Sequence, residues 1–137
     1  QFPSLLPTLT TLDNVILPTT FANGAGTEDK IGRATRLLDT VGLGDKVKAY
    51  PRQLSAGQQQ RVVIARALMN QPRILLADEP TSNLDERTEQ EIMELFHQIH
   101  NDTGITIVLV THTSQLVQYG TRAVVMAEGR VVETQSV

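Results

Sequence analysis

The sequence predicts an α/β protein in which a helical subdomain is set into a core of parallel strands and helices. Three observations predict this fold class. Apolar residues recur mostly at helical spacing before position 73, two short apolar runs follow, and an amphipathic segment lies between these runs. We therefore expect a helical region over 1–72 and an α/β region over 73–137. Hydrophobic residues make up 40% and charged residues 20% of the 137 residues, as in ordinary globular proteins.

The first 72 residues are expected to contain three helices. A short helix over 11–16 can be capped by Thr10 or Thr11. An amphipathic helix over 28–43 carries apolar residues at three- and four-residue spacing. A third helix over 57–69 ends before Pro72, because proline cannot continue a helix.

The α/β region is expected to contain a strand, a helix and a second strand in that order. The strands cover 74–77 and 105–110, and Asp85 can cap the intervening helix over 86–100. This order is that of a βαβ unit, whose two strands are parallel. The second run is apolar on both faces, so we expect the sheet to be covered on both sides.

The end of the chain is expected to form a β-hairpin. Residues 122–127 and 130–133 have strand-like patterns, and Glu128-Gly129 lies between them as a two-residue turn. The sequence contains no internal repeat and no low-complexity tract.

Charge and composition exclude several classes of protein. With 12 basic and 15 acidic residues, a net charge of −3, the chain has no broad basic surface for nucleic acid. It has no cysteine, which excludes disulfides, thiolate metal sites and cysteine nucleophiles. No apolar run reaches the roughly 18–20 residues that span a bilayer, so any link to a membrane is expected to go through a partner.

Polar side chains follow both expected strands of the βαβ unit. Asp78 and Glu79 end the first strand, and His112 follows the second. Ligands bind at the carboxyl ends of parallel strands, where Asp78 suits Mg²⁺ and Glu79 could activate a water aimed at a phosphate. His112 could hydrogen-bond a terminal phosphate. The alternatives are a solvated acidic pair and a surface histidine with ordinary partners.

The helix over 57–69 begins with a pattern that suits an anion. Ser55 offers a hydroxyl beside the unpaired N–H groups of a helix N-terminus, and Gly57 would let a phosphate approach the backbone. The alternative is a plain serine N-cap. The pattern Gly-x-x-x-x-Gly-Lys-Ser/Thr, which cradles phosphates, does not occur in the 137 residues.

Together these motifs resemble those of ABC-type ATPases, in the family's order and approximate spacing. Residues 54–61, Leu-Ser-Ala-Gly-Gln-Gln-Gln-Arg, resemble the signature motif. Residues 74–79 resemble the Walker B strand with its catalytic glutamate, and 82–85, Ser-Asn-Leu-Asp, resemble the D-loop. His112 is similar to the switch histidine and Gln1 to the glutamine of the Q-loop.

The resemblance implies a partial P-loop NTPase-type sheet that starts at the Q-loop, with the N-terminal P-loop part absent. It also implies ATP and Mg²⁺ as cofactors. Gln1 would contact Mg²⁺, and Asp78 would hold Mg²⁺ through water. Glu79 would be the general base, and His112 would contact the γ-phosphate. The isolated chain is expected to be inactive because it lacks Walker A.

The family's head-to-tail dimer implies a second set of site residues. These would face ATP held by the partner cassette or lie at the dimer seam: Ser55, Ala56, Gly57, Gln58 and Asp85. Two positions depart from the family pattern. Ala56 stands where glycine is usual, and a methyl there could tighten the approach to phosphate. Thr113 stands where an acidic or amide residue is common.

Finer similarities point to the lipoprotein-releasing and macrolide-export group. They lie in 6–15 and in 83–96. The resemblance implies a second ATPase domain and a membrane-spanning subunit as partners, no nucleic acid, and a cytoplasmic location on the inner face of the membrane. Two alternatives are an ABC-type ATPase of DNA repair or translation and a non-catalytic partner module. The short span from Gln1 to Leu54 and the lack of basic runs argue against the first.

Overall fold

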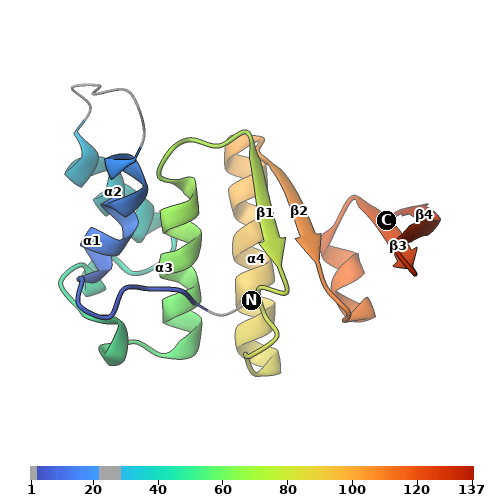
Figure 1. The fold of residues 1–137 in the computed structure, drawn as a ribbon, viewed down its shortest axis with the longest axis horizontal. Coiled ribbons are helices and arrows are strands. Elements are labelled where there is room, and N and C mark those ends of the chain that lie inside the picture. Colours follow the sequence, from blue (N-terminus) through green and yellow to red (C-terminus); the bar gives the residue numbers. More distant parts are fainter. Residues whose placement is uncertain (1–2, 22–28) are drawn as a thin grey trace.

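The computed structural model describes residues 3–21 and 29–137. Helices α1 to α3 and the strand–helix–strand unit β1–α4–β2 lie side by side, and a hairpin lies at the far end (Figure 1). Gln1, the expected Q-loop glutamine, lies outside the described residues. The chain order confirms an α/β fold whose helical region precedes its strands.

The helical region is held by three helices that share one core. Helix α1 (Thr11–Ile16) is capped by Thr10, whose side chain accepts from the Asp13 N–H, as the sequence predicts. Helix α2 (Lys30–Thr40) is shorter than the expected 28–43 because Val41 leaves helical geometry and Gly42 has φ +78°. Helix α3 (Ala56–Leu68) begins one residue earlier than predicted. Each of these helices contributes fully buried aliphatic side chains to the shared core.

The βαβ unit forms as predicted. Strand β1 (Ile74–Asp78) pairs in parallel with β2 (Thr106–Val110), and Asp78 lies opposite Val110. Between them, helix α4 (Glu86–Thr103) continues three residues beyond the predicted end, and Gly104 then stops it in the left-handed conformation, at φ +69°.

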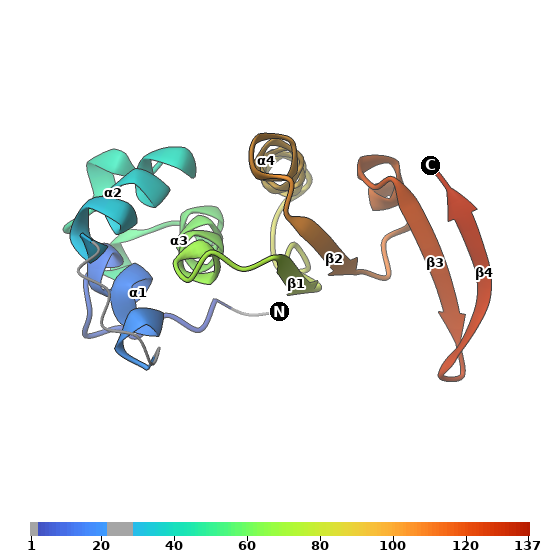
Figure 2. The same ribbon diagram turned by 90° about the horizontal axis from the view of Figure 1, so that it is seen from above.

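The sheet is covered on one face only within the described residues. Four side chains of one sheet face belong to the buried core or pack against it: Leu75, Ala77, Ile107 and Leu109. Helix α4 lies over one face of β1 and β2 (Figure 2). On the opposite face four large apolar side chains are 47–74% exposed: Ile74, Leu76, Val108 and Val110. The expectation of a sheet covered on both sides is therefore wrong for this part of the molecule, because no described helix lies over that face.

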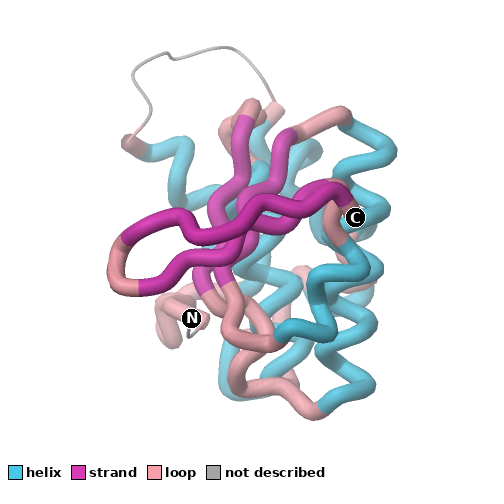
Figure 3. Tube along the Cα trace, turned by 90° about the vertical axis from the view of Figure 1, so that its right-hand side faces the viewer, coloured by secondary structure: helices cyan, strands magenta, loops and turns pink. Residues whose placement is uncertain are grey.

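The predicted hairpin also forms, as strands β3 (Arg122–Ala127) and β4 (Arg130–Ser136). Glu128 and Gly129 both have positive φ, as a tight two-residue turn requires. The hairpin is a separate two-stranded sheet that does not join β1 and β2. Its strands run across the direction of β1 and β2 (Figure 3). The described residues also contain four short 3₁₀ helices that were not predicted: Leu17–Thr20, Gly44–Lys46, Pro51–Gln53 and Ser114–Tyr119.

Candidate functional site

The functional candidates gather at one end of the molecule. Helices α3 and α4 begin at the end where β1 and β2 finish (Figure 1). Helix N-termini and the carboxyl ends of parallel strands thus share one surface. The helix N-termini supply N–H groups and the positive end of the helix dipole. The carboxyl ends of the strands are where α/β proteins bind ligands.

Glu79 leaves the sheet with an unusual backbone. Its N–H donates to the Val110 carbonyl at 2.8 Å, which ties it to the end of β2. Its φ is +42°, in the left-handed region that non-glycine residues rarely adopt. Such conformations cost about 1–3 kcal/mol and persist where the surroundings enforce them. Here the bond to Val110 ties the Glu79 backbone to the end of β2.

His112 and Glu79 are brought into contact, although 33 residues separate them in the chain. The His112 Nδ1 lies 3.1 Å from the Glu79 Oε1, and the two side chains are 73% and 29% exposed. An ionised carboxylate only accepts hydrogen bonds, so Nδ1 carries the proton in this contact. The prediction that both strands deliver polar groups to the same edge is confirmed.

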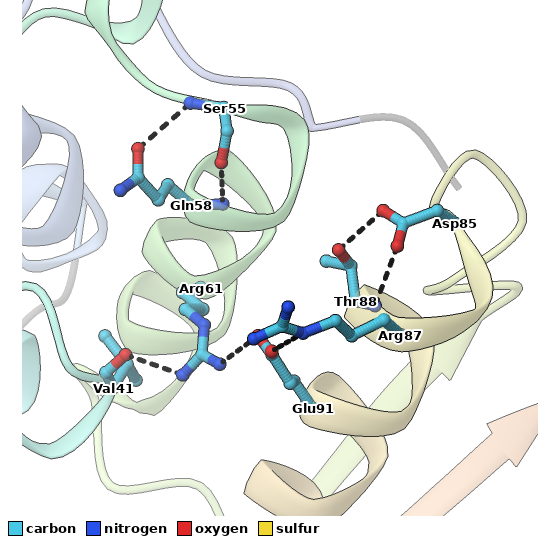
Figure 4. A network of polar contacts seen from close by, with 8 residues as sticks. All are labelled: Val41, Ser55, Gln58, Arg61, Asp85, Arg87, Thr88 and Glu91. Carbon is cyan, nitrogen blue, oxygen red and sulfur yellow. Dashed lines mark hydrogen bonds and ion pairs between the residues drawn. The ribbon is translucent and has the colours of Figure 1, made fainter.

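The start of α3 is a complete capping box. The Ser55 Oγ accepts from the Gln58 N–H at 3.2 Å, and the Gln58 Oε1 accepts from the Ser55 N–H at 3.0 Å (Figure 4). Ser55 and Ala56 are exposed, whereas Gly57 is buried. The serine N-cap considered from the sequence is therefore present, and the exposed Ser55 and Ala56 leave this helix start open to solvent.

Asp85 caps α4 in a similar way. Its carboxylate accepts from the Thr88 hydroxyl at 2.6 Å and from the Thr88 N–H at 3.2 Å (Figure 4). These bonds, first that of the Thr88 hydroxyl, lower the pKa of Asp85 below its ordinary value, because they stabilise the ionised carboxylate. Asp85 is therefore a charged group fixed at the helix start.

Two residues of this region were missed from the sequence. Thr88 touches both the Asp85 carboxylate and the α3 helix, and its spacing of three residues from Asp85 is a capping signal that could have identified it. Glu91 bonds Arg61 of α3 at 3.5 Å and Arg87 of α4 at 3.3 Å. The Arg61 contact spans 30 residues, and no local pattern indicates it.

The described residues supply part of a magnesium site at most. No group of three or more potential ligands gathers within 3–21 and 29–137. Asp78 is exposed at the strand end, and no hydrogen bond to its side chain is found among the described residues. A single open carboxylate fits Mg²⁺, which keeps several waters and takes other oxygens from phosphates. The Asp78 carboxylate therefore fits a Mg²⁺ ion that takes its other ligands from water and from the phosphates of a nucleotide.

Comparison with known proteins gives the family of this α/β chain. Residues 1–82, more than half of the chain, match the family described as ABC transporter. The chain therefore belongs to the ABC transporter family, as an ATP-binding component.

Two relatives carry names that bear on function. The chain is 52% identical over 131 residues to the macrolide export ATP-binding/permease protein MacB of Rhodopirellula baltica, covering 95% of this chain and 19% of that protein. It is 46% identical over 132 residues to the lipoprotein-releasing system ATP-binding protein LolD of Geobacter metallireducens, covering 96% and 58%. The chain thus spans only part of the length of these relatives.

Solved structures agree with the fold. The dimeric structure of MJ0796, a bacterial ABC transporter cassette, matches with a TM-score of 0.80 at 39% identity, over 98% of this chain and 59% of that one. A post-hydrolysis dimer of the same cassette bound to ADP and Pi matches with a TM-score of 0.81 at 39% identity, over 99% and 60%. The fold is therefore that of an ABC ATPase cassette.

Proposed function

We propose that this edge is part of the ATP-hydrolysing site of a transporter ATPase. The observation that carries the proposal is the bond between His112 and Glu79 at the carboxyl ends of two parallel strands. Glu79 is placed as the general base, whose carboxylate takes a proton from the attacking water. Asp78, beside it, would hold Mg²⁺ through water, and the bound ion would neutralise charge on the phosphates.

His112 is assigned to the γ-phosphate, and its present bond limits how it can act. Its Nδ1 proton is directed at Glu79, so a neutral ring presents Nε2 as an acceptor. Donation to a phosphate oxygen requires a second proton on the ring or release of the Glu79 bond. The contact therefore holds the imidazole ring next to the Glu79 carboxylate.

The second half of the proposed site lies at the two helix starts. Ser55, Ala56, Gly57 and Gln58 would face ATP held by a second cassette, and Asp85 would lie at the seam between the two. The exposed start of α3 supports this assignment, since N-terminal N–H groups favour phosphate. The two solved MJ0796 structures are dimers, which supports the pairing of two cassettes; the head-to-tail arrangement is part of the proposal. Gln1 would add a contact to Mg²⁺.

Transport is proposed to run through a membrane-spanning partner. None of the helices within 3–21 and 29–137 is long and apolar enough to cross a bilayer. The relatives named for macrolide export and lipoprotein release support an export or extraction role, with this cassette at the cytoplasmic face of the membrane. They favour this role over DNA repair or translation and over a non-catalytic module.

The assignment of the general base is tested in the full-length protein that contains these residues. Glu79→Gln is expected to lower Mg²⁺-dependent phosphate release by about 10²–10⁴-fold while an ATP-dependent dimer still forms in sedimentation. Glu94→Gln, which alters an exposed carboxylate on α4, is the matched control and should hydrolyse ATP normally. Normal turnover in Glu79→Gln would show that another group takes the proton.

Residues 1–137 on their own are a second test. They contain no phosphate-cradling glycine–lysine motif, so we expect no sustained phosphate release from the purified chain. Turnover that disappears in Glu79→Gln would contradict this expectation and would place a complete site within these residues.

A further inference from the structure

Gly57 of α3 lies directly against Thr88 of α4. A Cβ built on Gly57 would overlap the Thr88 Cγ2 methyl, and the next nearest atom, the Thr88 Cβ, lies at 3.8 Å. Gly57 is buried in the described structure, although its neighbours Ser55 and Ala56 are exposed. The two helices therefore meet at this point, and they meet this closely because residue 57 has no side chain.

Thr88 makes a second contact with its other branch. Its Oγ1 donates to the Asp85 Oδ1 at 2.6 Å, and its N–H donates to the Oδ2 at 3.2 Å (Figure 4). The methyl of one side chain thus fixes the start of α3, and its hydroxyl fixes the start of α4. The χ1 angle of a β-branched residue is stiff, so the two contacts are linked.

A polar network one turn further along holds the same pair of helices. Arg61 of α3 donates to the Val41 carbonyl at 3.1 Å and pairs with Glu91 of α4 at 3.5 Å. Arg87 also pairs with Glu91, at 3.3 Å (Figure 4). Glu91 thus receives one arginine from each helix, which limits sliding of α3 along α4.

We propose that Thr88 is a positioning residue that sets the α3 start, with Ser55 to Gln58, relative to Asp85. The inference deepens the proposed function, on which it rests: both segments would contact the partner cassette, so their spacing must match one shared surface. On this proposal Gly57 is glycine because Thr88 needs the space. The competing explanation is that only the phosphate of the partner's ATP needs it.

Two variants separate these explanations. Gly57→Ala should displace the α3 start, whereas Gly57→Ala combined with Thr88→Ser removes the obstructing methyl and keeps the hydroxyl that bonds Asp85. In the double variant the alanine Cβ would lie 3.8 Å from the Cβ of residue 88, an ordinary contact. If phosphate alone needed the space, the serine would restore nothing.

The readout is ATP-dependent dimerisation of the full-length protein in the Glu79→Gln background. We expect Gly57→Ala to weaken the dimer by about tenfold, and Thr88→Ser to recover most of that loss. ATP affinity of the single cassette should stay unchanged, because the variants act on the contact with the partner. A double variant as defective as Gly57→Ala, with equal folded content, would overturn the proposal.

Hydrogen–deuterium exchange over 54–60 supplies a readout that needs no ATP. Exchange there should rise in Gly57→Ala and return toward the wild-type rate with Thr88→Ser. Gly120→Ala is the matched control, because its added Cβ would approach no atom closer than 3.4 Å. If the wild-type protein neither dimerises with ATP nor hydrolyses it, the proposed function fails. The Gly57–Thr88 contact then stands or falls on the exchange data: unchanged exchange in Gly57→Ala overturns it.

Discussion

The helical region and the α/β region differ in how many of their large apolar side chains are exposed. Of the large hydrophobic side chains that are exposed among the described residues, four lie before position 73 and eleven after it. Those of the helical region are scattered over the surface, at Leu6, Phe21, Ile31 and Tyr50. Those of the α/β region lie on one face of β1 and β2 and along or next to the hairpin, apart from Val117 in the 3₁₀ helix Ser114–Tyr119. One buried core runs through both regions, but among the described residues only the α/β region has an exposed apolar sheet face.

This difference indicates that the two regions depend on their surroundings to different degrees. Parallel sheets are normally covered on both faces, and large exposed apolar patches mark surfaces that pair with other polypeptide. The α3–α4 contact, through Gly57, Thr88 and the Arg61–Glu91 pair, joins the helical region to a region whose sheet has one exposed apolar face. Substitutions of equal size should therefore have unequal effects in the two regions.

The largest expected difference is between two leucines. Leu38 in α2 is fully buried, so Leu38→Ala should lower the free energy of unfolding by about 2–5 kcal/mol. Leu76 in β1 is 74% exposed, and Leu76→Ala should change it by no more than about 0.5 kcal/mol. Urea unfolding measures both. Equal losses would mean that the exposed sheet face is covered in solution, which would erase the contrast between the regions.

Replacing a buried amide should cause the next largest loss of stability, and it extends the comparison of the two regions to polar side chains. Asn14 is fully buried and bonds both backbone groups of Leu6 and the carbonyls of Leu9 and Thr10. Asn14→Ala should cost about 1–3 kcal/mol, because those groups lose their partner. Asn101→Ala removes an exposed amide of α4 and serves as the control for thermal unfolding. A loss as large at Asn101 would contradict the explanation that burial of the Asn14 amide causes the effect.

The smallest expected effect concerns the junction of the regions and depends on pH. The pKa of Asp85 is lowered in the folded state, chiefly by the Thr88 hydroxyl, so its stabilising contribution is complete above the ordinary aspartate pKa. That contribution is lost as the pH falls through the lowered value. Asp85→Asn keeps an N-cap that does not titrate. Melting temperatures of both proteins should therefore diverge at neutral pH and converge in acid; a constant difference would refute the role of the charge.

Several features that depend on neighbours along the chain were predictable. The sequence predicts the Thr10 and Asp85 caps and the Glu128-Gly129 turn, and the structure confirms each. The 3₁₀ helices and the end of α4 at Gly104 were not predicted. The meeting of Glu79 and His112 was also predictable, because the topology of a βαβ unit brings both strand ends to one edge.

Features that depend on distant contacts could not be predicted. The sequence suggested a phosphate as the reason for Gly57, whereas the structure places the Thr88 methyl against it. The expectation of a doubly covered sheet failed because the pattern of β2 reports that its faces are apolar and does not report what covers them. The Arg61–Glu91 pair joins helices whose approach is a tertiary event.

The left-handed backbone at Glu79 has a consequence for how substitutions at this position will rank. With φ at +42°, glycine fits the conformation without strain, and every other residue type fits less well than it. A library screened only for thermal tolerance should therefore enrich glycine at position 79. A library screened for growth that depends on transport should retain glutamate there. The two rankings would disagree most at the residue where chemistry and folding make conflicting demands.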